Sequence, residues 1–177
     1  MKKLLFLFFL VSGFTEAQTV SFGNFKLQEQ EIIFQKIFVE DSITVAQLEK
    51  YYKGLPVVKN LTKTADGLTF NLEDVIIDYK KFQFSQVGTP TIIQTGKYSG
   101  EVTVGVKNGK YRVTFQTIQV TGDIGYKKIT EKDNLTNYAA KNSGTILAQD
   151  WCRPSMLGLL DQAFTDKLQF KKAKDDW

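Results

Sequence analysis

Apolar and polar residues alternate on both sides of an Asn108-Gly109 pair in residues 98–120. Alternation is typical of a half-buried strand, and Asn-Gly between two such runs favours a two-residue type I′ hairpin loop. In that register, the pairs on one face are Val106 with Tyr111, Val104 with Val113, and Val102 with Phe115. The other face is polar and brings together Lys107, Lys110 and Arg112. One face of this central hairpin therefore needs a cover, and the other faces water or a partner.

A strand and a helix precede this hairpin. Residues 31–39 mix β-branched and aromatic residues densely, which predicts a strand in the middle of a sheet, buried on much of both faces. Thr44 and Gln47 have the spacing of a capping box, so we expect a helix to begin here. Its apolar stripe includes Leu48 and Tyr52, which should lie on the sheet. The Gly-Leu-Pro sequence that follows ends the helix.

A second hairpin is predicted between this helix and the central hairpin. Residues 57–64 and 68–72 flank Ala65-Asp66-Gly67, where we expect the glycine to turn the chain through a positive φ. Residues 74–84 predict a further strand. Its alternation breaks at Tyr79-Lys80-Lys81-Phe82, which indicates a bulge or an exposed edge.

The remaining segments are less regular. Residues 19–30 predict an irregular N-terminal arm, and residues 85–96 predict a connection into the central hairpin. Residues 121–144 are polar and longer than an unstructured loop usually is, so we expect a short helix or strand near residues 129–140. A final helix follows, which Ser155 can cap. One of its faces consists of Met156, Leu160, Ala163, Phe164, Leu168 and Lys171.

These elements predict an α+β fold. We expect a single two-layer domain at residues 18–177, with the polar segment 121–144 inside it. A twisted antiparallel sheet should carry the short N-terminal helix and the C-terminal helix on one face. A chain of 177 residues fits one domain, and no repeat, low-complexity run or linker divides it.

The N-terminus has the pattern of a secretory signal. Met-Lys-Lys is followed by apolar residues 4–14 and then by small residues, so we expect residues 1–17 to be removed by cleavage between Ala17 and Gln18. The apolar run is shorter than the roughly 20 residues that a membrane-spanning helix needs. A buried N-terminal strand is the alternative. The residue directly after the cleavage site is Gln18 and not cysteine, so the sequence predicts an exported protein, periplasmic or secreted, that is not a lipoprotein.

The composition excludes several kinds of catalytic site. The chain has no histidine, which removes Ser-His-Asp and Cys-His catalysis and imidazole metal ligands. Its one cysteine, Cys152, can form neither an internal disulfide nor a thiolate zinc cluster. We expect Cys152 to be a small buried hydrophobe, and the alternative is an intermolecular disulfide or a reactive thiol. The sequence predicts no cofactor and no metal site.

Basic side chains are the candidate binding groups. Lys107, Lys110 and Arg112 share the open face of the central hairpin, and Lys80 and Lys81 lie among aromatic residues. Such a surface can bind an anionic glycan, lipid headgroups or single-stranded nucleic acid. The alternative is a solvated face whose lysines prevent edge-to-edge aggregation. Export argues against nucleic acid, so the predicted partner is an unknown envelope protein or an anionic glycan.

The strand, the capped helix and the central hairpin resemble a family of exported Bacteroidota proteins, a domain of unknown function described as having a TBP-like fold. The resemblance covers about residues 31–120, and its distinctive block is residues 106–114, VKNGKYRVT. It implies a twisted antiparallel sheet with helices on one face, and it implies no activity. The helix lacks the tryptophan associated with the family. The other matching residues are Ile33, Phe34, Lys36 and Phe38 in the strand and Leu48 and Tyr51 in the helix.

Three short motifs are candidate modification sites. Asp41-Ser42-Ile43 resembles the acceptor motif of Bacteroidota O-glycosylation, and modification of Ser42 requires that the site before the helix be exposed. Asn60-Leu61-Thr62 and Asn134-Leu135-Thr136 are N-glycosylation sequons if the source is eukaryotic.

The sequence predicts an exported, non-catalytic binding or protein-interaction module of the cell envelope. Its candidate contact surfaces are the polar face of the central hairpin and residues 121–144. A hydrolase built on carboxylates that the fold brings together is the alternative, and it needs two such groups within about 10 Å. A further alternative is a structural subunit whose apolar edge another chain completes.

Overall fold

An antiparallel sheet forms one layer of the protein. Its strands are β1 (Ser21–Phe22), β2 (Phe25–Gln28), β3 (Glu31–Val39), β4 (Val58–Lys63), β5 (Gly67–Ile76), β6 (Lys97–Lys107), β7 (Lys110–Asp123) and β8 (Lys128–Asn134). The computed structural model describes residues 20–172, and in that part of the chain the strand order is β1-β2-β3-β7-β6-β5-β4, with β8 paired to β7. The predicted signal peptide, residues 1–17, and its Ala17-Gln18 cleavage bond lie outside the described residues.

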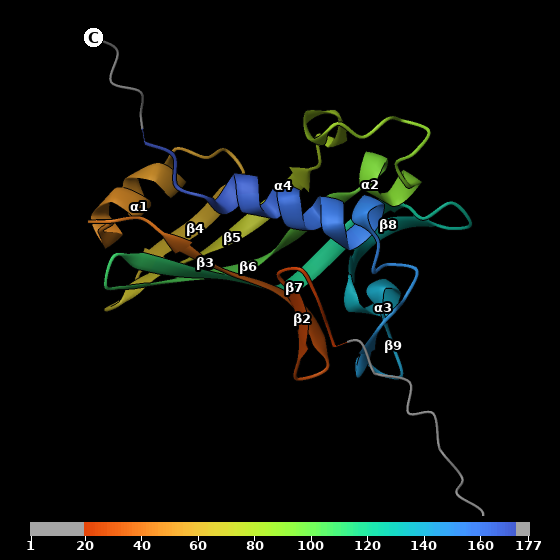
Figure 1. Ribbon diagram of the computed structural model, residues 1–177, viewed down its shortest axis with the longest axis horizontal. Coiled ribbons are helices and arrows are strands. Elements are labelled where there is room, and N and C mark those ends of the chain that lie inside the picture. The colour runs from red at the N-terminus through yellow and green to blue at the C-terminus, as the bar shows by residue number, and fades with distance from the viewer. Residues whose placement is uncertain (1–19, 173–177) are drawn as a thin grey trace, which may run out of the picture.

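The main helices cover one face of this sheet. The helical segments are α1 (Val45–Lys53), the 3-10 turn η1 (Tyr79–Phe82), α2 (Thr91–Thr95), α3 (Thr136–Ala139), the π-helical turn η2 (Pro154–Gly158) and α4 (Leu159–Leu168). Figure 1 shows α1 and α4 on the same side of the sheet, while α3 and β9 (Ala140–Lys141), which pairs with β10 (Ile146–Leu147), lie at one end. The predicted α+β arrangement, with both helices on one face, is confirmed.

The central hairpin has the predicted register. The paired residues on its inner face are Val102 with Phe115, Val104 with Val113, and Val106 with Tyr111. Asn108 and Gly109 have φ angles of 50° and 69°, and a type I′ loop requires both to be positive. The valine face packs beneath the helices, so the polar face points the other way.

The side chain of Phe164 in α4 lies at the centre of the core and is fully buried. Aromatic rings from four strands surround it, with ring centroids 5.1 to 6.0 Å from its own. These rings belong to Phe25, Phe34, Tyr98 and Phe115. Tilted and edge-on pairs each contribute about 0.5 to 1.5 kcal/mol beyond the area that they bury, so this cluster fixes α4 on the sheet.

The predicted capping box at the start of α1 is present. Thr44 Oγ1 accepts a hydrogen bond from the Gln47 N–H at 3.2 Å, and Gln47 Oε1 accepts one from the Thr44 N–H at 2.9 Å. Leu48 and Tyr52 are fully buried, as predicted. The Tyr52 hydroxyl donates to the carbonyl oxygen of Leu168 at 2.6 Å, which ties α1 to the end of α4.

Two segments differ from the sequence prediction. The strand predicted at residues 74–84 is wrong beyond Ile76, because the following chain turns into η1, where the Asp78 carboxylate accepts from the Lys81 N–H at 3.3 Å. The irregular arm predicted at residues 19–30 contains the β1–β2 hairpin, which buries Phe25 completely. Residues 129–140 hold both a strand, β8, and a short helix, α3.

Two residues have other roles than the sequence predicts. Ser155 does not cap a helix, because it lies inside η2 and α4 begins after Gly158 without a side-chain cap. Gly67 does not have a positive φ. A β-carbon at Gly67 would overlap the carbonyl oxygen of Val104, so glycine is needed there for the close approach of β5 to β6.

Val104→Asp should unfold the protein. The Val104 side chain is 1% exposed, and an unpaired charge there costs several kcal/mol of a total stability of about 5 to 15 kcal/mol. Thermal unfolding followed by circular dichroism measures the effect. Thr103→Asp is the control, since Thr103 is exposed on the opposite face and should melt near the wild-type temperature. Unchanged melting of Val104→Asp would show that the two faces are assigned the wrong way round.

Gly67→Ala and Gly105→Ala should differ sharply although these residues are cross-strand partners. A methyl group at Gly67 meets the β6 backbone, whereas no atom lies within 4 Å of a β-carbon at Gly105. We expect Gly67→Ala to cost at least about 2 kcal/mol of unfolding free energy through overpacking, and Gly105→Ala to cost nothing measurable. Urea unfolding of both variants measures this, and equal stability would contradict the close approach.

Stability should fall as the pH rises above about 10. Burial raises the pKa of Tyr52 and Tyr98 far above the ordinary tyrosine value, and it raises the pKa of Tyr111 to about 12. The unfolded chain ionises its tyrosines near pH 10, so unfolding releases protons above that pH. The stability from these neutral hydroxyls is therefore present in full below pH 10; the part from Tyr111 is lost between about pH 10 and 12.

Urea unfolding of Tyr98→Phe between pH 8 and 11 tests this. Because each such tyrosine contributes about 1.4 kcal/mol per pH unit above its unfolded pKa, the variant should lose stability less steeply than the wild type by about that amount. Tyr126→Phe is the matched control, because its side chain is exposed in the folded state. If the unfolding free energies of the wild type and Tyr98→Phe fall equally steeply with pH, the prediction is refuted.

Candidate binding surface on the open face of the sheet

Two neighbouring rows of residues on β6, β7 and β3 form the face of the sheet that points away from α1 and α4. In the first row Arg112 pairs with Gly105 on one side and with Ile37 on the other. In the second row Lys110 pairs with Lys107 and with Val39. Side chains alternate between the faces of a strand, so all six positions share the open face. We call these six residues, Ile37, Val39, Gly105, Lys107, Lys110 and Arg112, the hairpin surface.

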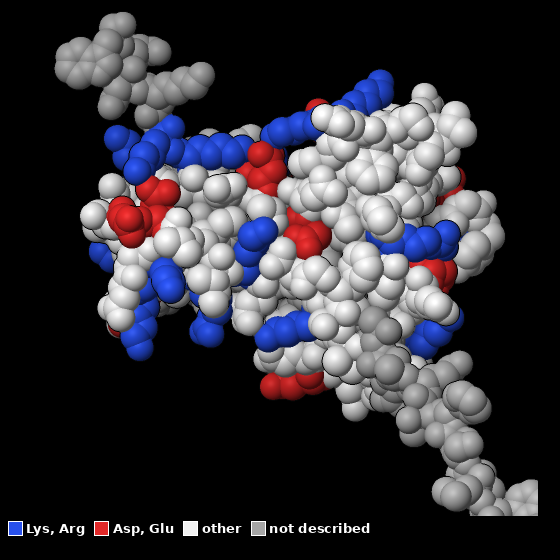
Figure 2. Space-filling model, viewed as in Figure 1, with Lys and Arg blue, Asp and Glu red and all other residues white. Residues whose placement is uncertain are grey.

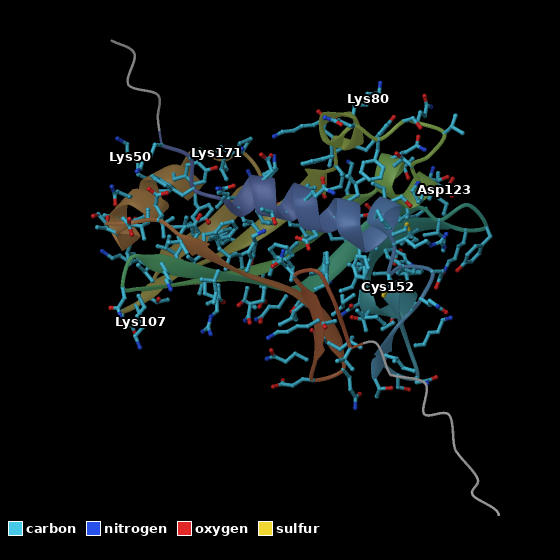
Figure 3. The ribbon with its side chains drawn as sticks, viewed as in Figure 1. Lys50, Lys80, Lys107, Asp123, Cys152 and Lys171 are labelled. Carbon is cyan, nitrogen blue, oxygen red and sulfur yellow. The ribbon has the colours of Figure 1, made fainter. Side chains whose placement is uncertain are left out.

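The hairpin surface contains a shallow hollow. Its volume is about 560 Å³, and Gly105, Lys107, Lys110, Arg112 and Ile37 are among the residues that line it. Gly105 forms the floor, because no atom lies within 4 Å of where its β-carbon would be. Figure 3 shows Lys107 pointing away from the helices, and Figure 2 shows basic side chains projecting from this end of the molecule. The sequence prediction that Lys107, Lys110 and Arg112 share a face agrees with this geometry.

The three basic side chains of the hairpin surface lack acidic partners. Within residues 20–172, Lys107, Lys110 and Arg112 form no ion pair, whereas Lys81 and Lys171 on the helical side both pair with Asp166. Like charges directly opposite each other on neighbouring strands are destabilising, and Lys107 faces Lys110 in this way. The surface therefore carries concentrated positive charge that a bound anionic group would neutralise.

Ile37 and Val39 add exposed apolar area beside these charges. Their side chains are 60% and 69% exposed, and they lie on the half of β3 that pairs with β7 alone, since β2 pairs only with residues 31–34. The prediction that β3 is buried on much of both faces is therefore wrong for its second half, because no helix covers the outer face there. The sequence did not identify these residues as functional. Apolar residues occupy both odd and even positions of residues 31–39, so the pattern does not indicate which face of the strand is exposed.

A polar network borders the hairpin surface. Gln35 Nε2 donates to Thr114 Oγ1 at 3.0 Å, and Lys26 Nζ donates to Gln35 Oε1 at 2.9 Å. These bonds link β2, β3 and β7 on the open face and hold their side chains in place. The two hydrogen bonds therefore connect three strands beside Ile37 and Arg112.

A second hollow on the sheet contains two carboxylates. Glu73 and Glu101 line it together with Lys132, next to a register shift at Gly100, and its volume is about 200 Å³. Hydrolysis needs an acid and a base that converge in a place sheltered from water, but both glutamates are exposed. Within residues 20–172 no three side chains among Asp, Glu and Cys gather as metal ligands. The hydrolase alternative therefore has two carboxylates in one hollow, but neither of them is buried.

The other candidate residues lie apart from both hollows. Cys152 is half-buried rather than fully buried, and burial raises the pKa of its thiol. Ser42 is exposed just before α1, which satisfies the requirement for its modification. The Asn134 side-chain amide donates a hydrogen bond to Glu31 at 3.3 Å, and its oxygen accepts one from the Thr136 N–H at 2.8 Å. The acceptor side chain of this sequon is therefore engaged in hydrogen bonds within the protein.

Within residues 20–172 no helix is both long enough and apolar enough to span a bilayer.

Comparison with known proteins gives two structural neighbours. No family model and no curated protein matches the chain. Among solved structures, it is similar to a DUF4468 family protein from Bacteroides ovatus, with 17% identity and a TM-score of 0.44, over 82% of this chain and 84% of that one. It is also similar to a TBP-like protein from Parabacteroides distasonis, with 10% identity and a TM-score of 0.44, over 80% of this chain and 90% of that one. These neighbours carry the descriptions that the sequence resemblance predicts, a TBP-like domain of unknown function.

Proposed function

We propose that this protein is an exported, non-catalytic interaction module of the cell envelope, and that its hairpin surface binds an acidic patch on a partner protein. The observation that supports this most is the group of three basic side chains without acidic partners, placed around a glycine floor and beside two exposed aliphatic residues. Export rests on the signal pattern of residues 1–17.

The mixture of charge and apolar area favours a protein partner. Protein interfaces combine an apolar centre with a polar rim, and arginine is enriched in them. Ile37 and Val39 supply apolar area, and Arg112 lies directly opposite Ile37. A purely electrostatic ligand such as an anionic glycan gains nothing from the two aliphatic side chains, so their exposure is the feature that favours protein over glycan.

The shape of the site favours binding over catalysis. The hollow is open and shallow, and its lining contains one carboxylate, Asp66, beside the three basic groups. A catalytic site for hydrolysis needs an acid and a base that converge on one bond in a place sheltered from water. An open basic surface instead accelerates the encounter with an acidic partner and fixes its orientation.

Reversing two charges should abolish partner capture. We expect Lys110→Glu with Arg112→Glu to recover none of the envelope proteins that the wild type recovers from native extracts at low salt. The matched control is Lys50→Glu with Lys80→Glu, which changes the net charge equally but lies on the helical side, where Figure 3 labels both residues. Mass spectrometry of the captured proteins measures the result. Equal recovery by the two double variants would remove the hairpin surface from this proposal.

Gly105→Val separates shape from charge. Valine fits a strand, and no atom lies within 4 Å of a β-carbon at Gly105, so we expect this larger side chain to fill the floor of the hollow, with normal melting and weaker capture. Retention on heparin resin tests the glycan alternative with the Lys110→Glu, Arg112→Glu double variant and with Ile37→Ser. If the double variant is not retained, Ile37→Ser is retained like the wild type, and no protein is captured, the surface would be assigned to an anionic glycan instead.

A further inference from the structure

A third, separate cleft lies at the opposite end of the molecule from the hairpin surface. Figure 3 labels Lys107 at one end and Asp123, where the β7–β8 turn begins, at the other. The cleft lies between this turn, α2, α3 and the chain around Trp151, and its volume is about 220 Å³. The lining residues that matter for its chemistry are Tyr126, Asn137, Tyr138, Asp150 and Trp151.

Hydrogen bonds hold the walls of this cleft in place. Asp123 Oδ1 accepts from the Gly125 N–H at 2.7 Å, and the Asp123 N–H donates to Thr95 Oγ1 at 2.9 Å, which links the β7–β8 turn to α2. The Tyr138 hydroxyl donates to Asp133 Oδ2 at 2.5 Å, and Asn137 Nδ2 donates to Asp133 Oδ1 at 2.8 Å. Both sides of the cleft are therefore ordered before a ligand arrives.

Tyr126 is the unusual residue of this cleft. Its side chain is 87% exposed at the tip of the β7–β8 turn, whereas Trp151 across the cleft is almost fully buried. A large exposed aromatic ring beside a cleft is a common sign of a binding site, because its apolar face gains little from water. A ligand in the cleft would lie against this ring.

The electrostatics of the cleft favour a cation. Asp150 is the one charged residue among the described residues that line it, and within residues 20–172 its carboxylate forms no ion pair. Arg153 lies three residues after Asp150 in the chain, but it donates its Nε–H to the Asp150 carbonyl oxygen at 2.6 Å and does not line the cleft. Aromatic ring faces carry negative potential and attract ammonium groups. Three aromatic residues and a carboxylate together repel anions and attract an organic cation.

The size of the cleft limits the ligand. Pockets for drug-sized molecules have volumes of about 300 to 1,000 Å³, so about 220 Å³ accommodates only a small group. We propose that this cleft binds a small free organic cation with a quaternary ammonium group, held by the rings of Tyr126 and Tyr138 and by the Asp150 carboxylate, with the nearly buried Trp151 as part of the lining. This inference is independent of the hairpin surface and of its proposed partner.

Titration with choline tests the proposal directly. The chain has two tryptophans, and Trp177→Phe leaves Trp151 as the single tryptophan, whose fluorescence can be excited selectively. We expect choline chloride to change its fluorescence saturably at constant ionic strength, with a matching signal in calorimetry. The neutral analogue 3,3-dimethylbutan-1-ol has a carbon in place of the nitrogen and should bind at least tenfold more weakly. Absence of a saturable signal in both methods, or equal binding of the neutral analogue, would overturn the proposal.

Two pairs of variants in the same background identify the groups that bind. Asp150→Asn should weaken choline binding about tenfold, while Glu131→Gln, which removes an equal charge on β8 outside the cleft, should leave it unchanged. Tyr126→Leu should bind at least threefold more weakly than Tyr126→Phe, which keeps the ring. Equal effects within either pair would overturn the assignment, and thermal melting of each variant checks that it is folded.

Discussion

The burial of Phe164 among the rings of Phe25, Phe34, Tyr98 and Phe115 is the interaction on which the rest of the structure depends. These rings come from four strands and meet one residue of one helix, so the cluster joins the two layers at a single point. The chain after α4 then follows the same side of the sheet, where the Tyr111 hydroxyl accepts from the Phe170 N–H at 2.6 Å. Covering the valine face in this way leaves the other face of the central hairpin without a second layer.

The uncovered face explains where binding chemistry is available. Lys107 and Lys110 face each other there, and Ile37 and Val39 remain in contact with water, an arrangement that folding alone does not favour. The helical side shows the opposite pattern, since Asp166 pairs with two lysines and Glu40 pairs with Lys172. Asp166 and Glu40 thus neutralise three lysines on the helical side, whereas within residues 20–172 Lys107, Lys110 and Arg112 form no ion pair.

Local sequence patterns predicted much of the fold. The alternation around Asn108-Gly109 determined the register of the central hairpin, and the spacing of Thr44 and Gln47 determined the start of α1, because both depend on neighbours within a few residues. Two of the errors lie where contacts distant in sequence decide. The β1–β2 hairpin depends on Phe25 reaching Phe164, and Gly67 is required by the backbone of β6 rather than by its own φ.

The sequence by itself determined the α+β class, the inner and outer faces of the central hairpin, and the grouping of Lys107, Lys110 and Arg112 on one of them. Strand alternation makes these properties follow from the order of residues alone. Only the tertiary structure decided that Ile37 and Val39 join that group, because their exposure depends on which face α1 and α4 leave bare. It alone also brought Tyr126, Tyr138 and Asp150 to one cleft, because no local pattern relates a turn, a short helix and a loop that pack together at the end of the sheet.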